Sequence, residues 1–164
     1  MSDQILELFV MPAHSPPVLL HLLTPRETEI LGLVADGLGN SEIATRIGLA
    51  EDTVKSNLRS IRAKLGRSSR PVLADMACRA GHVARPKGAE AVRPEISDEE
   101  TTTLRLLAQG AGAREVAKAQ LMSHHTAKKH IRRLLDKMGA SDAVHGVSLA
   151  WSWHILNADE GARS

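Results

Sequence analysis

The feature that most constrains the fold of this chain is an internal repeat. Leu31 has a counterpart in Leu104, 73 positions further on, and the same displacement aligns the flanking sequence without a gap. The matched pairs include Glu27 with Glu100, Gly37 with Gly110, Lys55 with Lys128, Arg59 with Arg132, and Gly66 with Gly139. Because glycines, acids and bases all keep one register, the pattern indicates that one module occurs twice.

The most informative part of the first copy is the stretch 40–65, which predicts two helices joined by a tight corner. Gly48 can adopt the positive φ that ends a helix. Apolar residues recur at helical spacing on both sides of it. These are Ile43, Ala44 and Ile47 before the corner, and Val54, Leu58, Ile61 and Leu65 after it. We expect the first helix over 41–47, and Asp52 or Thr53 as the N-cap of the second.

The outer face of that second helix is basic, and no acidic residue lies between Thr53 and Arg70. A short helix, a glycine corner and a longer helix with a basic outer face are typical of a helix-turn-helix DNA reader. The whole-chain formal charge of +2 is too small to indicate a polyanion partner by itself.

Each copy also has signals for a helix before and a helix after this pair. Thr24 and Glu27 have the spacing of a capping box with Pro25 at the first helical position, and Ser97 and Glu100 repeat it. We expect fourth helices over 70–80 and 142–155. In the second reader helix the core stripe is predicted at Ala127, Ile131, Leu134 and Met138. With aromatics at only 2%, the core must be aliphatic.

The predicted fold class is therefore all-α, with two four-helix domains in tandem joined by a linker that contains proline and glycine. We expect an N-terminal arm at 1–22, domains at 23–80 and 96–157, a linker at 81–95 and a tail at 158–164. The arm either packs on a neighbouring domain or binds a partner.

Several classes of protein are disfavoured. Cys78 is the only cysteine, which excludes a disulfide within the chain and favours a reducing cytoplasm. No apolar run approaches the roughly 18 residues of a membrane span, and the N-terminus lacks a secretory signal. We find no convergent nucleophile, base or phosphate loop, so we predict no catalytic site and no cofactor. Cys78 and His82 are half a metal site at most, and we predict no metal.

At this point the sequence resembles a known family. Leu23–Glu27 reads Leu-Thr-Pro-Arg-Glu, and it is followed by Asn-Ser-Glu-Ile-Ala at 40–44, Thr-Val-Lys at 53–55 and Lys-Leu-Gly at 64–66. These motifs resemble the LuxR-type (GerE- or FixJ-type) DNA-binding domain of bacterial transcription regulators, densely over 23–80 and more loosely over 96–155. The resemblance implies a four-helix domain whose third helix enters the major groove, with dimerisation through the fourth helix.

The resemblance also implies which side chains face the bases. They are Lys55, Ser56 and Arg59 in the first copy, and Lys128, Lys129 and Arg132 in the second. The second copy departs from the family pattern, since Ala113-Arg114 replaces Asn-Ser and Gln120 stands in an apolar position. It either binds DNA or is kept for packing.

We therefore predict a sequence-specific, double-stranded DNA-binding transcriptional regulator that acts in the cytoplasm on the nucleoid. Its predicted DNA-binding residues are Thr53, Lys55, Ser56, Arg59, Arg62, Lys64, Thr126, Lys128, Lys129, Arg132 and Arg133. The two modules act either as a covalent pseudo-dimer or within a homodimer that pairs through the fourth helices. The alternative is a protein-interaction module that binds RNA polymerase or another regulator.

Overall fold

The computed structural model describes residues 20–67 and 69–157. Within them the chain forms eight α-helices, one short 3-10 helix and no strand, which confirms the all-α prediction. The first half contains η1 (Leu20–Leu22), α2 (Pro25–Ala35), α3 (Asn40–Ile47), α4 (Glu51–Leu65) and α5 (Arg70–Arg79). The second contains α6 (Asp98–Ala108), α7 (Ala113–Ala119), α8 (His124–Met138) and α9 (Ala143–Ser152). Most of the predicted arm and the whole predicted tail lie outside the described residues.

Helix starts follow the predicted capping chemistry in α2 and α6. Thr24 Oγ1 accepts a hydrogen bond from Glu27 N at 3.2 Å, and Glu27 Oε2 accepts one from Thr24 N at 2.8 Å. Ser97 and Glu100 form the same capping box. The predicted cap of α4 is wrong: Ala50 is its N-cap, without a side-chain hydrogen bond. Glu51 and Asp52 lie instead in the first turn, where negative charge interacts favourably with the helix dipole.

The core of the first half is aliphatic, as predicted. Val54, Leu58, Ile61 and Leu65 of α4 are all buried, and α4 packs against α2 and α3 in one apolar cluster that also includes residues of α5. In the second half, Ala127, Leu134 and Met138 of α8 are buried and Ile131 is partly buried. The corner between α3 and α4 is made by Gly48 at φ 67°, also as predicted. This packing leaves the opposite sides of α4 and α8 facing outward.

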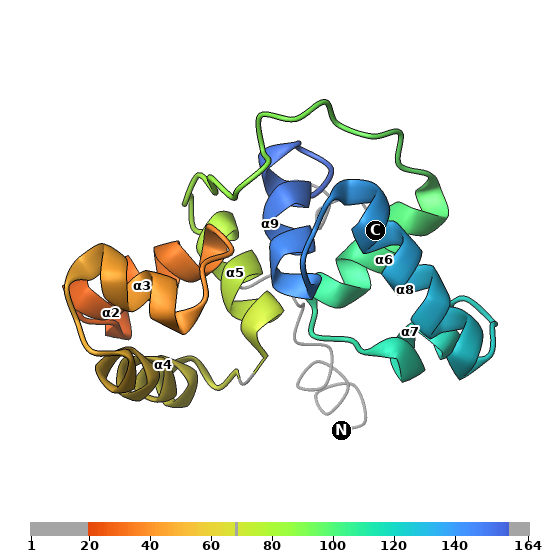
Figure 1. Ribbon diagram of the computed structural model, residues 1–164. Coiled ribbons are helices and arrows are strands. Elements are labelled where there is room, and N and C mark those ends of the chain that lie inside the picture. Colours follow the sequence, from red (N-terminus) through yellow and green to blue (C-terminus); the bar gives the residue numbers. More distant parts are fainter. Residues whose placement is uncertain (1–19, 68, 158–164) are drawn as a thin grey trace, which may run out of the picture.

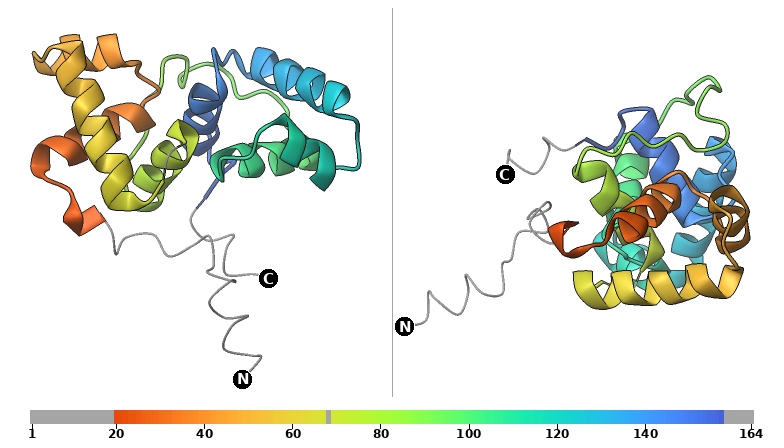
Figure 2. Two further views of the ribbon diagram at one scale, coloured as in Figure 1. Left: turned by 90° about the horizontal axis from the view of Figure 1, so that it is seen from below. Right: turned by 90° about the vertical axis from the view of Figure 1, so that its left-hand side faces the viewer.

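The two halves meet through their fourth helices. α5 packs against α9 and α6 in the centre of the molecule, with α4 and α8 at opposite ends (Figures 1 and 2). Trp151 Nε1 donates to Asp75 Oδ1 at 2.9 Å, and Arg79 Nε donates to Asp75 Oδ2 at 2.7 Å. The Arg79 guanidinium lies 5.5 Å from the centre of the Trp151 ring. Val144 of α9 belongs to the core of the first half, so the two halves share apolar packing.

The segment between α5 and α6 crosses over α9 and is bonded to it (Figure 1). Trp153 Nε1 donates to the Ala89 carbonyl at 3.0 Å, and His145 Nε2 donates to the Lys87 carbonyl at 2.7 Å. Arg93 in turn donates to the Trp153 carbonyl at 3.1 Å. The predicted linker is thus anchored along its length rather than only at its ends.

Candidate nucleic-acid interface

The outward face of α4 brings together four of the six predicted DNA-binding residues of the first half. Thr53, Lys55, Ser56 and Arg59 are all exposed, on the side opposite the buried stripe. Lys55 Nζ lies 3.0 Å from Glu51 Oε1 and 3.5 Å from Asp52 Oδ1, and the hydrogen bond to Glu51 raises the pKa of the Lys55 amine. Across the described residues, Arg59 makes no ion pair.

The structure separates the other two predicted residues, Arg62 and Lys64, from this group. Lys64 Nζ binds Glu27 Oε2 at 2.7 Å, and Ser60 Oγ donates to Glu27 Oε1 at 2.6 Å. These bonds, led by the one from Lys64, lower the pKa of the buried Glu27 from 4.5 to about 2. Arg62 is half-buried, with its Nε enclosed and unbonded within the described part of the chain. Burial, followed by the nearby charge of Arg62, lowers the pKa of Arg70.

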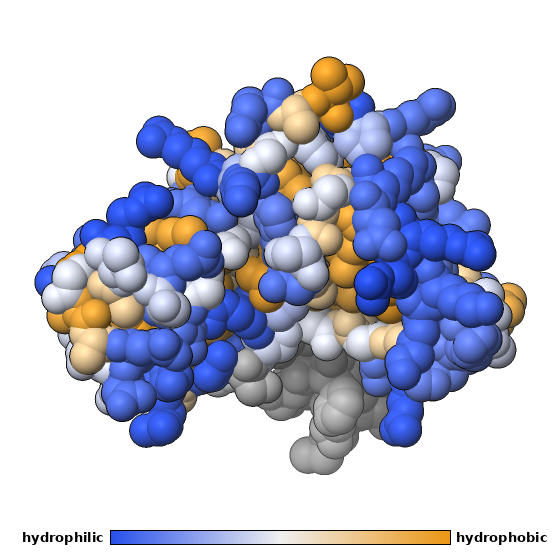
Figure 3. Space-filling model, in the orientation of Figure 1, coloured by the Kyte–Doolittle hydropathy of each residue, from blue (hydrophilic) through white to orange (hydrophobic). Residues whose placement is uncertain are grey.

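All five predicted residues of α8 are exposed: Thr126, Lys128, Lys129, Arg132 and Arg133. Arg132 Nε lies 3.6 Å from Asp136 Oδ2. At the 73-residue displacement, the acids Glu51 and Asp52 and the serines Ser56 and Ser60 become His124, His125, Lys129 and Arg133. The outer face of α8 is therefore more basic than that of α4, and hydrophilic side chains dominate over it in Figure 3.

Comparison with known proteins gives the family. The model of the "Bacterial regulatory proteins, luxR family" matches residues 21–77 and again residues 95–150. The chain belongs to the luxR family of bacterial regulatory proteins. This is a family of regulators and not an enzyme family. No solved structure matches the chain.

Curated relatives are similar to the chain over about a third of its length. A Mycobacterium bovis protein named as an HTH-type transcriptional regulator is 44% identical over 59 residues, which are 36% of this chain and 7% of that protein. The oxygen regulatory protein NreC of Staphylococcus aureus is 43% identical over 56 residues, which are 34% of this chain and 26% of NreC. The chain therefore spans only a small part of the length of either relative.

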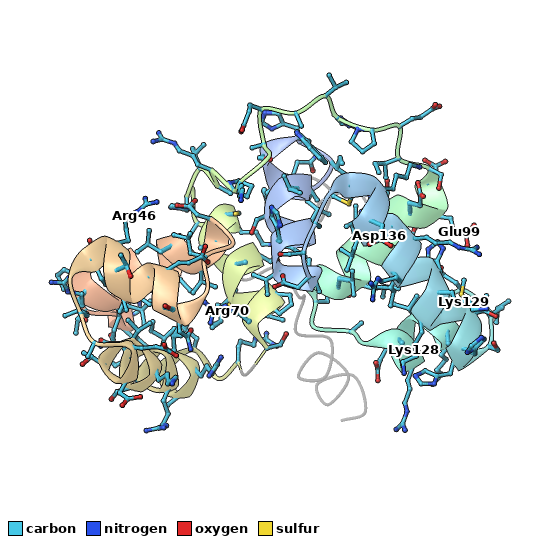
Figure 4. All side chains as sticks on the ribbon, viewed as in Figure 1. Arg46, Arg70, Glu99, Lys128, Lys129 and Asp136 are labelled. Carbon is cyan, nitrogen blue, oxygen red and sulfur yellow. The ribbon has the colours of Figure 1, made fainter. Side chains whose placement is uncertain are left out.

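The second luxR-family segment has an open groove beside α8. The groove is lined from α7 by Ala113 and from α8 by His125, Lys128, Lys129, Ile131, Arg132, Arg133 and Leu135. Its basic side chains are exposed, whereas Leu135 is buried and Ile131 partly buried. In Figure 4, Lys128 and Lys129 lie at the end of the molecule distant from Arg70, which is the first residue of α5.

The same segment holds a polar cluster that sequence reasoning missed. Thr103, which is fully buried, occupies the position of Ile30 in the first half. Its hydroxyl donates to the Glu99 carbonyl at 3.1 Å and accepts from Gln120 Nε2 at 2.9 Å and His130 Nε2 at 2.8 Å. The Gln120 amide nitrogen thus has partners in an otherwise apolar position, whereas Gln120 Oε1 is buried without a hydrogen-bond partner among the described residues. The repeat did contain a signal for this cluster. At the 73-residue displacement, the apolar Ile30 and Ile47 of the first copy are replaced by the polar Thr103 and Gln120.

Neither a metal centre nor a membrane span is found among residues 20–67 and 69–157. No three His, Cys, Asp or Glu side chains there are grouped to hold a metal ion. His82 Nε2 is 2.9 Å from Asp36 Oδ1, and burial raises the pKa of the Cys78 thiol to about 12. In the same part of the chain, no helix has the length and apolar character needed to cross a bilayer.

Proposed function

We propose that the chain is a transcriptional regulator that binds double-stranded DNA in the bacterial cytoplasm, with α4 entering the major groove. The observation that carries this proposal is the exposed polar and basic face of α4 opposite a fully buried stripe. Membership of a family of bacterial regulators supports it, as do the names of the mycobacterial and staphylococcal relatives. A helix held rigidly by its inner face is the usual way to present side chains to base edges.

The exposed residues of α4 have different expected roles. Arg59 is free of ion pairs within the described structure, and a guanidinium can donate two hydrogen bonds to the O6 and N7 of a guanine. Lys55, Thr53 and Ser56 can contact phosphates or neighbouring bases, with Lys55 exchanging its acidic partners for DNA. Arg62 and Lys64, held by the fold, would support the helix and add positive charge behind it.

On α8, the proposal assigns phosphate contacts to the exposed Thr126, Lys128, Lys129, Arg132 and Arg133. Such contacts displace counterions and give salt-dependent affinity that does not depend on sequence. The two reader helices would then contribute unequally, since α4 keeps the family motif more closely.

We further propose that one chain supplies both halves of the DNA-binding unit. The packing of α5 on α9 supports this, because each fourth helix already covers the other within the chain. A homodimer formed through fourth helices would have to break that contact. Because α4 and α8 differ in sequence, the preferred DNA site should be asymmetric. Two chains protecting one perfect palindrome in a footprint would contradict this arrangement.

The DNA-binding proposal predicts that Arg59→Ala weakens binding to a preferred site by about 1–3 kcal/mol, because the base contact is lost. The site is obtained by selecting genomic fragments with the full chain at about 0.15 M salt, where charge alone gives weak binding. Fluorescence anisotropy on that site and on a random duplex then separates the two kinds of contact.

Arg85→Ala, at an exposed arginine between the halves, is the matched control and should leave binding unchanged. Equal weakening of both duplexes by Arg59→Ala would reduce Arg59 to a phosphate contact. If the wild-type chain enriches no genomic fragment in the selection, the proposal that it binds specific DNA sites is wrong.

A further inference from the structure

The groove beside α8 combines an apolar floor with a basic rim. Ala113, Ile131 and Leu135 form the floor, and Lys128 and Arg132 stand on the rim. Leu135 is only 9% exposed, so the floor is set into the surface, while both rim side chains are open to solvent. Hydrophilic side chains flank apolar surface in this part of the molecule (Figure 3).

The first half has polar groups at the equivalent positions. Asn40 corresponds to Ala113, Arg62 to Leu135 and Arg70 to Ala143. There the Arg70 guanidinium donates to Asn40 Oδ1 at 2.8 Å and to the Leu38 carbonyl at 2.7 Å (Figure 4 labels Arg70). The second half has neither arginine and lacks the asparagine. The surface that Arg70 covers with hydrogen bonds in the first half is therefore an open apolar groove in the second.

We propose that this groove docks an acidic segment of another protein. Apolar side chains of the segment would pack on Ala113, Ile131 and Leu135, and its carboxylates would pair with Lys128 and Arg132. Protein interfaces have an apolar centre and a polar rim, and a basic rim is complementary to a partner that carries negative charge. This inference goes beyond the proposed function and does not require that the chain bind DNA.

Other ligand classes fit the groove less well. A phosphate backbone gains nothing from a leucine–isoleucine floor, because its affinity comes from charge. Small molecules are usually bound in sites that enclose most of their surface, whereas the rim here is exposed. An extended or helical peptide with apolar residues on one side matches an open groove along a helix.

The inference has a consequence for DNA binding. Lys128 and Arg132 cannot pair with carboxylates and phosphates at the same time, so an acidic partner would compete with DNA for α8. α4 lies at the opposite end of the molecule and would remain available (Figure 1).

The test uses the full chain and a displayed library of random peptides of about 15 residues, long enough for four helical turns. We expect enriched peptides to be net acidic, with apolar residues three or four positions apart. Leu135→Arg restores the first-half residue and should weaken these peptides at least about tenfold by filling the floor. Val92→Arg adds the same charge at a 94% exposed valine and should leave peptide affinity unchanged.

Circular dichroism checks that Leu135→Arg folds. Lys128→Glu, on the exposed rim, is a second variant that should also weaken the peptides at least about tenfold. The inference is overturned if no acidic peptide is enriched, or if the selected peptides bind the two variants as well as the wild type. It is also overturned if Leu135→Arg weakens random duplex DNA and peptide equally. Binding of selected genomic fragments, measured in parallel, reports separately on the DNA-binding proposal.

Discussion

At the scale of single residues, the second half keeps backbone conformations for which the first half uses glycine. Leu121 (φ 53°) and His154 (φ 55°) are the non-glycine residues with positive φ among those described. At the 73-residue displacement they correspond to Gly48 (φ 67°) and Gly81 (φ 101°). The surrounding helices therefore impose a left-handed turn even where the residue disfavours it, at a cost of about 1–2 kcal/mol.

We predict that Leu121→Gly stabilises the chain by about 0.5–1 kcal/mol, because the left-handed conformation costs glycine little. Leu121 is 95% exposed, so little packing is lost. Urea unfolding followed by circular dichroism measures the change. Gly48→Ala is the matched reverse change: an added Cβ there has open space around it, so a loss of about 1 kcal/mol would come from the backbone alone. Destabilisation by Leu121→Gly would mean that the side chain makes a stabilising contact.

The Glu27–Lys64 pair gives a prediction for pH dependence. Folding lowers the pKa of Glu27 from 4.5 to about 2, so the carboxylate stabilises the fold above about pH 4.5 and its contribution is lost as the pH falls toward 2. Glu27→Gln keeps a capping oxygen but removes the charge, and should cost about 2 kcal/mol at pH 7.

Urea midpoints between pH 2 and pH 7 should show the gap between wild type and Glu27→Gln closing over that acidic range. Glu29→Gln, at an exposed glutamate of the same helix, should change stability by less than about 0.5 kcal/mol. A gap that is constant with pH would mean that Glu27 acts through shape rather than charge.

At the scale of helices, spacing predicted which elements form but not which charges are free. Val54, Leu58 and Ile61 fix the inner face of α4 by their spacing alone, because a buried stripe is a local property of one helix. Lys64 reads as part of the basic face, yet it binds Glu27, a residue 37 positions earlier. That pairing depends on how α2 crosses α4, which local periodicity does not describe.

The repeat itself contained a signal for this pairing. Glu100 and Lys137 lie at the same displacement from Glu27 and Lys64, and they form the equivalent ion pair at 2.8 Å. Two charged positions that recur together in both copies indicate a contact. The start of α4 was missed for a different reason: Asp52 and Thr53 are both good caps, but two acids in a first turn are stabilised there as well.

At the scale of the whole molecule, the sequence predicted two modules and left their arrangement open. Residues that join them are spread over α5, α9 and the segment between α5 and α6, and none belongs to a local motif. Trp151 lies in the predicted fourth helix of the second copy, residues 142–155. In the structure it packs against the apolar clusters of both halves and binds Asp75, so it joins the two copies within one chain.

We therefore predict that the two halves unfold together and that Trp151→Ala uncouples them. The substitution removes an aromatic ring from both clusters and leaves the buried Asp75 with Arg79 as its remaining partner. A loss of about 2–4 kcal/mol is expected. In scanning calorimetry, the single transition of the wild type should split into two, because the contact that makes unfolding cooperative is weakened.

Trp151→Phe separates the two contributions of this side chain. It keeps most of the apolar contact and loses only the hydrogen bond to Asp75, so it should lower stability by about 1–2 kcal/mol and retain one transition. Sedimentation velocity on the wild type should show a single chain, since each fourth helix is already covered by the other. A wild-type chain that melts in two steps would mean that the two halves unfold independently. A Trp151→Ala variant that still melts in one step would mean that contacts other than those of Trp151 couple the halves.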